Sequence, residues 1–102
     1  MRPGTTKAVT LGGGYQRLAT LYDSAFTDTI KSADGNEVAN QVLLAITTQS
    51  AEIAYGTTMP VVSGHPLTAG DSITLGNQEF IKRAWLRYST SGSIVIITPI
   101  YE

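Results

Sequence analysis

The only histidine of the chain, His65, stands in the stretch GHPLTAGDSITLGN, residues 64 to 77. A histidine can bind a metal or act as a general base, but both roles need further side chains that converge on the imidazole. The only titratable neighbour in this stretch is Asp71, which lies across a turn. Pro66 favours an extended backbone at His65, as at the start of a strand. We therefore expect an exposed or interface turn residue, or a hydrogen bond at a subunit contact that would respond to pH.

Other catalytic patterns are incomplete. The glycines of LGGGYQR, residues 11 to 17, lack the spacing of a dinucleotide or P-loop motif, and the chain contains no Gly-x-Ser-x-Gly and no cysteine. Two carboxylates could flank a glycosidic bond, but each lies in a predicted turn or on a polar strand face. We expect no enzymatic activity, no catalytic residue, no cofactor and no metal. The eight carboxylates from which such a pair could come are Asp23, Asp28, Asp34, Glu37, Glu52, Asp71, Glu79 and Glu102.

Aromatic residues could form a platform on which a sugar ring stacks. Trp85 alternates with Leu86 in a predicted strand, so Trp85 shares a face with Arg83 and Arg87. Two interpretations remain open. Trp85 either belongs to the core or to an inter-subunit contact with Arg87 packed over it, or it forms a carbohydrate site together with exposed tyrosines.

Period-two alternation recurs along the chain and predicts β-strands. Residues 41–47 and 51–55 are predicted to form one hairpin, and residues 84–88 and 94–98 to form a second. Further strands are expected at 7–11 and 72–75, and residues 15–26 are expected to form a turn of helix or an irregular arm. Pro99 lacks a backbone donor and should end the last strand or make it an edge. Both faces of that last strand are apolar, so it should lie centrally or against another subunit.

These elements predict an all-β fold, a small antiparallel β-sandwich with jelly-roll-like character. A length of 102 residues suits one domain. Residues 1–14 are expected to form a flexible N-terminal arm that docks onto a neighbouring subunit, and residues 15–102 the sandwich domain.

The composition restricts the partners of the protein. Charged residues make up 15% of the chain and the net charge is −1, so no basic surface for nucleic acid or anionic membranes is expected. The chain contains no apolar run long enough for a membrane span and no signal-peptide pattern. We expect production in a cytoplasm.

Two short motifs stand in the second half of the chain, a turn that leads into a strand and a closing pair of strands. Their residues are Pro66, Leu67, Gly70, Asp71, Ser72, Ile73 and Leu75, followed by Ala84, Leu86, Gly92, Ser93, Val95 and Ile97. Through these residues the chain resembles small virion proteins of tailed bacteriophages, of the capsid cement or decoration type. That resemblance implies a β-sandwich, a dimer or trimer, that clamps neighbouring major capsid protein subunits on the outer surface of the expanded head, and it carries over no catalytic residue. It also implies production in the cytoplasm of the host.

Three other functions remain open at this stage. The protein could be a head-closure or tail-adaptor protein, a host-carbohydrate-binding module displayed on the particle, or a hydrolase with two convergent carboxylates. For a structural role, we expect interface residues on the apolar strands and among the aromatic and arginine side chains. These are Val9, Leu11, Tyr15, Trp85, Arg87, Ile97 and Tyr101.

Overall fold

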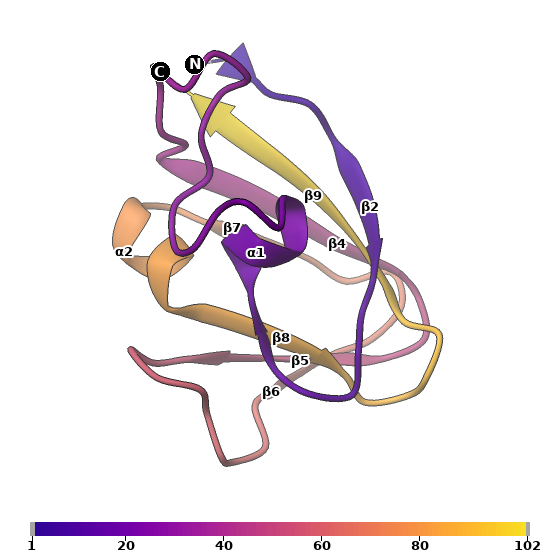
Figure 1. Ribbon diagram of the computed structural model, residues 1–102. Coiled ribbons are helices and arrows are strands. Elements are labelled where there is room, and N and C mark those ends of the chain that lie inside the picture. The colour runs from indigo at the N-terminus through magenta and orange to yellow at the C-terminus, as the bar shows by residue number, and fades with distance from the viewer. Residues whose placement is uncertain (1, 102) are drawn as a thin grey trace.

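The computed structural model describes residues 2–101 and shows two antiparallel sheets that face each other (Figure 1). The first sheet has the order β1-β9-β4-β7, with β2 also paired to β9, and the second has the order β3-β8-β5-β6. The strands of the first sheet are β1 (Arg2–Pro3), β2 (Lys7–Thr10), β4 (Gln41–Thr48), β7 (Ser72–Leu75) and β9 (Ile94–Tyr101). The strands of the second sheet are β3 (Gln16–Arg17), β5 (Ala51–Tyr55), β6 (His65–Leu67) and β8 (Ala84–Tyr88). The predicted all-β sandwich is confirmed.

The strand order is that of a jelly roll. The pairs β2–β9, β3–β8, β4–β7 and β5–β6 are the pairs of one long antiparallel hairpin. Two further pairs, β4–β9 and β5–β8, form when that hairpin is rolled up. The result is two four-stranded sheets of Greek-key topology, with β1 as a short addition.

Both predicted hairpins are wrong in their pairing, although their strands lie where the alternation placed them. β4 and β5 belong to different sheets, and so do β8 and β9. The short polar loops are corners at which the chain crosses from one sheet to the other, on the right of Figure 1. Gly92 and Gln49 take positive φ at these corners, and Ser50 accepts a hydrogen bond from the Ser89 amide at 2.9 Å. Strand alternation cannot distinguish a hairpin from such a corner.

Gln49 is the only described non-glycine residue with positive φ, at 57°. The left-handed conformation costs an L-residue roughly 1–2 kcal/mol, and a glycine avoids this cost. Part of the gain is offset, because a glycine gives the unfolded chain more conformational entropy. We expect Gln49→Gly to raise the free energy of unfolding by about 0.5–1 kcal/mol, measured by urea denaturation. Ser50→Gly, one residue away at negative φ, is the control and should lower it. Equal losses in both variants would contradict this reading of the corner.

Pro99 neither ends the last strand nor makes it an edge, as the sequence had suggested. β9 continues to Tyr101, and Pro99 is buried opposite Val42 in the middle of the first sheet. The reason is a break in the neighbouring edge between β1 and β2. The Pro99 carbonyl accepts from the Gly4 amide at 2.7 Å, so the missing donor of Pro99 points at this break, where no ladder partner requires it. The central position predicted for β9 is confirmed, since β9 lies between β4 and β2.

The segment expected as a flexible arm forms part of the sandwich over its described residues. β1 and β2 pair with β9. Val9 packs against the core and Leu11 lies within it at 3% exposure. Val9 and Leu11 are two residues apart, so both side chains point to the inner face of the sheet. Their burial favours a segment that is held on its own sandwich.

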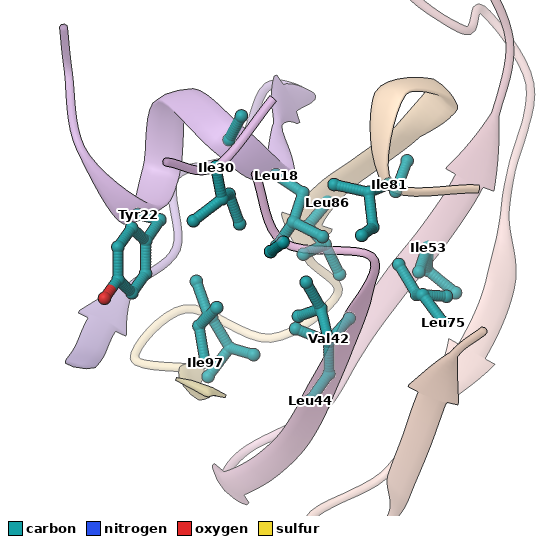
Figure 2. Packing of buried hydrophobic residues seen from close by; sticks show 14 of the residues in the cluster. Leu18, Tyr22, Ile30, Val42, Leu44, Ile53, Leu75, Ile81, Leu86 and Ile97 are labelled. Atoms are coloured by element: carbon teal, nitrogen blue, oxygen red, sulfur yellow. The ribbon is translucent and has the colours of Figure 1, made fainter. Parts of the chain in front are cut away.

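Two short helices, α1 (Leu18–Tyr22) and α2 (Gln78–Arg83), pack against the core. In Figure 1, α2 lies on the side away from the corners and α1 lies near the middle of the view. α1 confirms the predicted turn of helix and buries Leu18 and Tyr22 one turn apart. α2 begins where Asn77 accepts a hydrogen bond from the Phe80 amide, and it buries Ile81. Figure 2 shows that residues from both helices meet the inward residues of both sheets in one core. Labelled in the figure are Leu18, Tyr22, Ile30, Val42, Leu44, Ile53, Leu75, Ile81, Leu86 and Ile97.

Candidate functional site

Three of the seven residues predicted at an interface meet on the outer face of the second sheet. Tyr15 and Trp85 form a small cluster with Ala54, separate from the main core, and Arg87 lies over the Tyr15 ring at 4.3 Å from its centroid. Leu86, on the same strand, points the other way into the main core. The alternation therefore assigned the Trp85–Arg87 face correctly.

Trp85 and Arg17 hold the beginning of the loop between β5 and β6. The Trp85 indole Nε1 donates to the Gly56 carbonyl at 3.0 Å, and Arg17 donates to the Thr57 carbonyl at 2.9 Å. The Arg17 guanidinium also stacks on the Trp85 ring, 4.5 Å from its centroid. Trp85 is 8% exposed, so this ring is committed to contacts within the chain.

Glu52 holds the end of the same loop. One of its oxygens, Oε1, accepts from the Gly64 amide at 3.1 Å, from Arg87 at 2.9 Å and from the Tyr15 hydroxyl at 3.2 Å. The single hydrogen of the Tyr15 hydroxyl is shared between Glu52 and the Val62 carbonyl, which lies at 2.9 Å. Glu52 and Arg87 thus form a partly buried ion pair that fixes the loop to the strand beneath it.

Gly64 is required for the close approach of this loop to the sheet. A Cβ at this position would lie 2.5 Å from the Ile53 carbonyl oxygen and 2.9 Å from the Tyr15 hydroxyl. Neither the backbone of β5 nor the hydrogen-bonded hydroxyl can move away cheaply. The loop end is therefore fixed by shape as well as by hydrogen bonds.

We name residues 56–64, with the sequence GTTMPVVSG, the apolar loop. Between its two fixed ends it presents four consecutive apolar residues, Met59 to Val62. Met59 is 56% exposed, Val61 95% and Val62 64%. The loop projects from the second sheet at the bottom of Figure 1. An anchored run of exposed apolar residues is unfavourable in water and is typical of a surface that another molecule covers.

The carboxylate that holds the loop makes its attachment sensitive to acid. Hydrogen bonds from the Gly64 amide, Arg87 and Tyr15 hold the pKa of Glu52 below its ordinary value of 4.5. A lowered pKa stabilises the folded state above pH 4.5, and this contribution is lost as the pH falls through the lower folded value. We expect Glu52→Gln to be less stable than the wild type at pH 7 and the two melting temperatures to converge as the pH falls through the folded pKa of Glu52. A difference in melting temperature that stays constant as the pH is lowered from 7 into the acid range would contradict this role.

The four remaining predicted interface residues lie in the core between the sheets. Leu11 and Ile97 are 3% and 0% exposed, and Tyr101 is 6% exposed. Val9 is partly buried and packs against the same core. Their contacts are therefore with residues of their own chain.

His65 lies on the edge strand β6, opposite Ile53, and is exposed. Asp71 accepts hydrogen bonds from the amide and hydroxyl of Thr68 across the predicted turn. Among residues 2–101, no group of three or more His, Cys, Asp and Glu side chains is arranged to hold a metal ion. The described chain also has no helix long and apolar enough to span a bilayer.

Comparison with known proteins identified no relative of the chain. No protein-family model, curated protein or solved structure matches the chain. The site must therefore be interpreted from its own contacts.

A cleft of about 590 Å³ opens between the N-terminal strands and the segment around residues 22–37. Lys7 donates to the Tyr22 carbonyl at 3.1 Å, and Arg2 forms an ion pair with Glu37 across the cleft. Asp34 accepts from Ser32 and from the Asn36 amide, and these hydrogen bonds lower its pKa. These charged side chains hold the segment in place, which favours a structural role for the cleft.

Sequence reasoning missed the apolar loop and the role of Glu52. A signal for the loop was present, because four apolar residues stand in a row outside any strand pattern between Gly56 and Gly64. For Glu52 no local signal exists. Its partners come from β8, from the residue before β3 and from the loop end, which are far apart in the sequence.

Proposed function

We propose that the protein is a capsid decoration protein of a tailed bacteriophage, which docks onto the outer surface of the expanded head through its apolar loop. The observation that carries this proposal is the exposure of Met59, Val61 and Val62 on a loop whose two ends are fixed. Because the loop is held before binding, little conformational entropy is lost when a hollow on the coat covers it. The major capsid protein is the partner that the resemblance implies.

Repetition on the shell makes a modest contact sufficient. A docked copy stabilises the state of the coat that it binds, by mass action, and contacts to adjacent coat subunits add through effective concentration. A jelly-roll sandwich is also a fold that viral capsid proteins use. Fold alone does not assign a function, so the proposal rests on the loop.

The alternatives fit these contacts less well. A carbohydrate platform needs exposed rings, whereas Trp85 is 8% exposed and covered by Arg17. A hydrolase needs two convergent carboxylates, whereas Glu52 is occupied by three donors. A head-closure or tail-adaptor protein would share the loop and differ in copy number.

The experiment is a binding stoichiometry. Purified protein is mixed with expanded and unexpanded empty heads of the phage that encodes it, the heads are sedimented, and bound protein is quantified per coat subunit. We expect saturation at a fixed, near-stoichiometric ratio on expanded heads only. A few copies per particle would identify a connector, and absence of binding to both forms would overturn the proposal.

A further inference from the structure

The cleft between the N-terminal strands and the segment around residues 22–37 is large enough for a small organic molecule. Its volume of about 590 Å³ lies within the usual range of ligand pockets, roughly 300–1,000 Å³. The cleft opens beside the N-terminus at the top of Figure 1, whereas the apolar loop projects at the bottom. The contacts that hold its two walls together leave two polar groups of its lining with unused hydrogen-bonding capacity. These groups belong to Tyr101 and Lys7.

The Tyr101 hydroxyl has no partner within the described chain. Tyr101 is 6% exposed and lines the cleft, yet its hydroxyl forms no hydrogen bond with any of residues 2–101. The hydroxyl is not sealed from solvent, so the space that it meets is the cleft. Burial raises the pKa of Tyr101 above its ordinary value of 10.0, and the nearby Tyr22 and Glu37 act in the same direction. The hydroxyl therefore keeps its proton at neutral pH and offers the cleft a hydrogen-bond donor.

Lys7 supplies a positive charge to the same cleft. Its ammonium donates to the Tyr22 carbonyl at 3.1 Å and lies 4.4 Å from the centroid of the Tyr22 ring. An ammonium has three N–H donors, and that of Lys7 forms no ion pair with a described residue. Lys7 is partly buried, so its attraction for an anion in the cleft is screened less than on an open surface. Tyr22 lies next to both Lys7 and Tyr101, which places the two donors around one ring.

The carboxylates of the cleft already have donors of their own. Glu37 is paired with Arg2. Asp23 and Asp34 accept hydrogen bonds from residues of their own turns. Lys31 also lines the cleft and has no ion pair within residues 2–101. The unpaired donors favour an anion over a cation, and the three carboxylates nearby favour an anion with a single charge over a dianion such as phosphate.

Aromatic rings form the apolar part of the lining. Phe26 lines the cleft and stacks with Tyr22, with 6.5 Å between the ring centroids and 11° between the ring planes. Phe26 is only partly buried, so part of its ring is open to the cleft. An apolar group of a ligand can pack against this open part.

We infer that the cleft binds a small monocarboxylate with an apolar body. The carboxylate accepts hydrogen bonds from the Lys7 ammonium and the Tyr101 hydroxyl, and the body packs against Phe26. A charge-assisted hydrogen bond from an ammonium to a carboxylate is about twice as strong as a neutral one, so Lys7 makes the larger contribution. This site is independent of the apolar loop and of the coat as its partner.

The test uses 3-phenylpropionate as the probe and 3-phenylpropanamide as its uncharged counterpart. Each is titrated into ¹⁵N-labelled protein, and the amide signals are followed by NMR. We expect shifts confined to residues around the cleft and a dissociation constant of about 1 mM for the acid. The wild type should prefer the acid to the amide at least about tenfold. Lys7→Gln should reduce this preference to less than about twofold, whereas Lys82→Gln, which removes the same charge on α2 outside the cleft, should retain it.

Tyr101→Phe separates binding from folding, because it keeps the buried ring and removes only the hydroxyl. It should bind the acid roughly tenfold more weakly than the wild type. Its melting temperature should equal that of the wild type, since the hydroxyl has no partner in the free protein. Absence of shifts around the cleft at up to about 20 mM acid would overturn the inference. So would equal affinities of the wild type for acid and amide, or an unchanged preference in Lys7→Gln.

Discussion

Val61→Asp is expected to reduce binding to expanded heads by at least about 100-fold while leaving the melting temperature almost unchanged. Burying a valine side chain contributes about 1.5–3 kcal/mol, and a buried, unpaired carboxylate costs several kcal/mol more. Each 1.4 kcal/mol changes affinity tenfold. Val61 is 95% exposed in the free protein, so the substitution removes almost no contact within the chain. Affinity is measured by sedimentation of heads over a range of protein concentrations.

The control adds the same charge elsewhere on the surface. Ala33 is exposed in the segment that closes the cleft, away from the apolar loop. Ala33→Asp should bind heads like the wild type. Retained binding by Val61→Asp, or equal losses in both variants, would show that the coat contact lies outside the loop.

Ile97→Ala is expected to lower the free energy of unfolding by about 3 kcal/mol, the usual cost of truncating a fully buried isoleucine. Ile97 is 0% exposed and packs in the core between the sheets. For a domain of this size, such a loss is a large part of the total stability and lowers the melting temperature by more than about 10 °C. Urea denaturation gives the free energy directly.

Its neighbour on the same strand is the matched control. Ile96 points to the outer face of the first sheet and is partly exposed. Ile96→Ala should therefore cost less than about 1 kcal/mol. Similar losses for the two variants would contradict the assignment of opposite faces to adjacent residues of β9.

The positions of the main strands, and which of their side chains share a face, could be predicted because burial on one side of a sheet imposes a period of two. Alternation placed Trp85 and Leu86 on opposite faces of their strand, and the structure has Leu86 in the main core and Trp85 in the separate cluster on the outer face. It could not give the pairing, since the polar corner at Gly92 has the same residue types as a hairpin turn. Pro99 misled for a related reason. The missing N–H of a proline disrupts a strand only where a carbonyl of the neighbouring strand would accept from it. Whether such a carbonyl is present depends on the neighbouring strand, which the local sequence does not show.

The candidate site was predictable only in part. Tyr15, Trp85 and Arg87 were chosen as aromatic and arginine side chains typical of interfaces, and they do lie together. Tyr15 and Trp85 contact the apolar loop of their own chain, and Arg87 pairs with Glu52. Composition could not reveal these partners. The exposed Met59–Val62 run was visible in the sequence, but its fixed position depends on Glu52 and on contacts across four elements.

Thiol accessibility at position 61 tests the central claim most directly, because the chain contains no cysteine of its own. Val61→Cys is prepared together with the control Ala33→Cys, and maleimide labelling rates are measured for free protein and for protein bound to expanded heads. We expect binding to slow labelling at position 61 at least about tenfold and to leave position 33 unchanged. Equal labelling of Cys at position 61 in free and bound protein would contradict docking through the apolar loop.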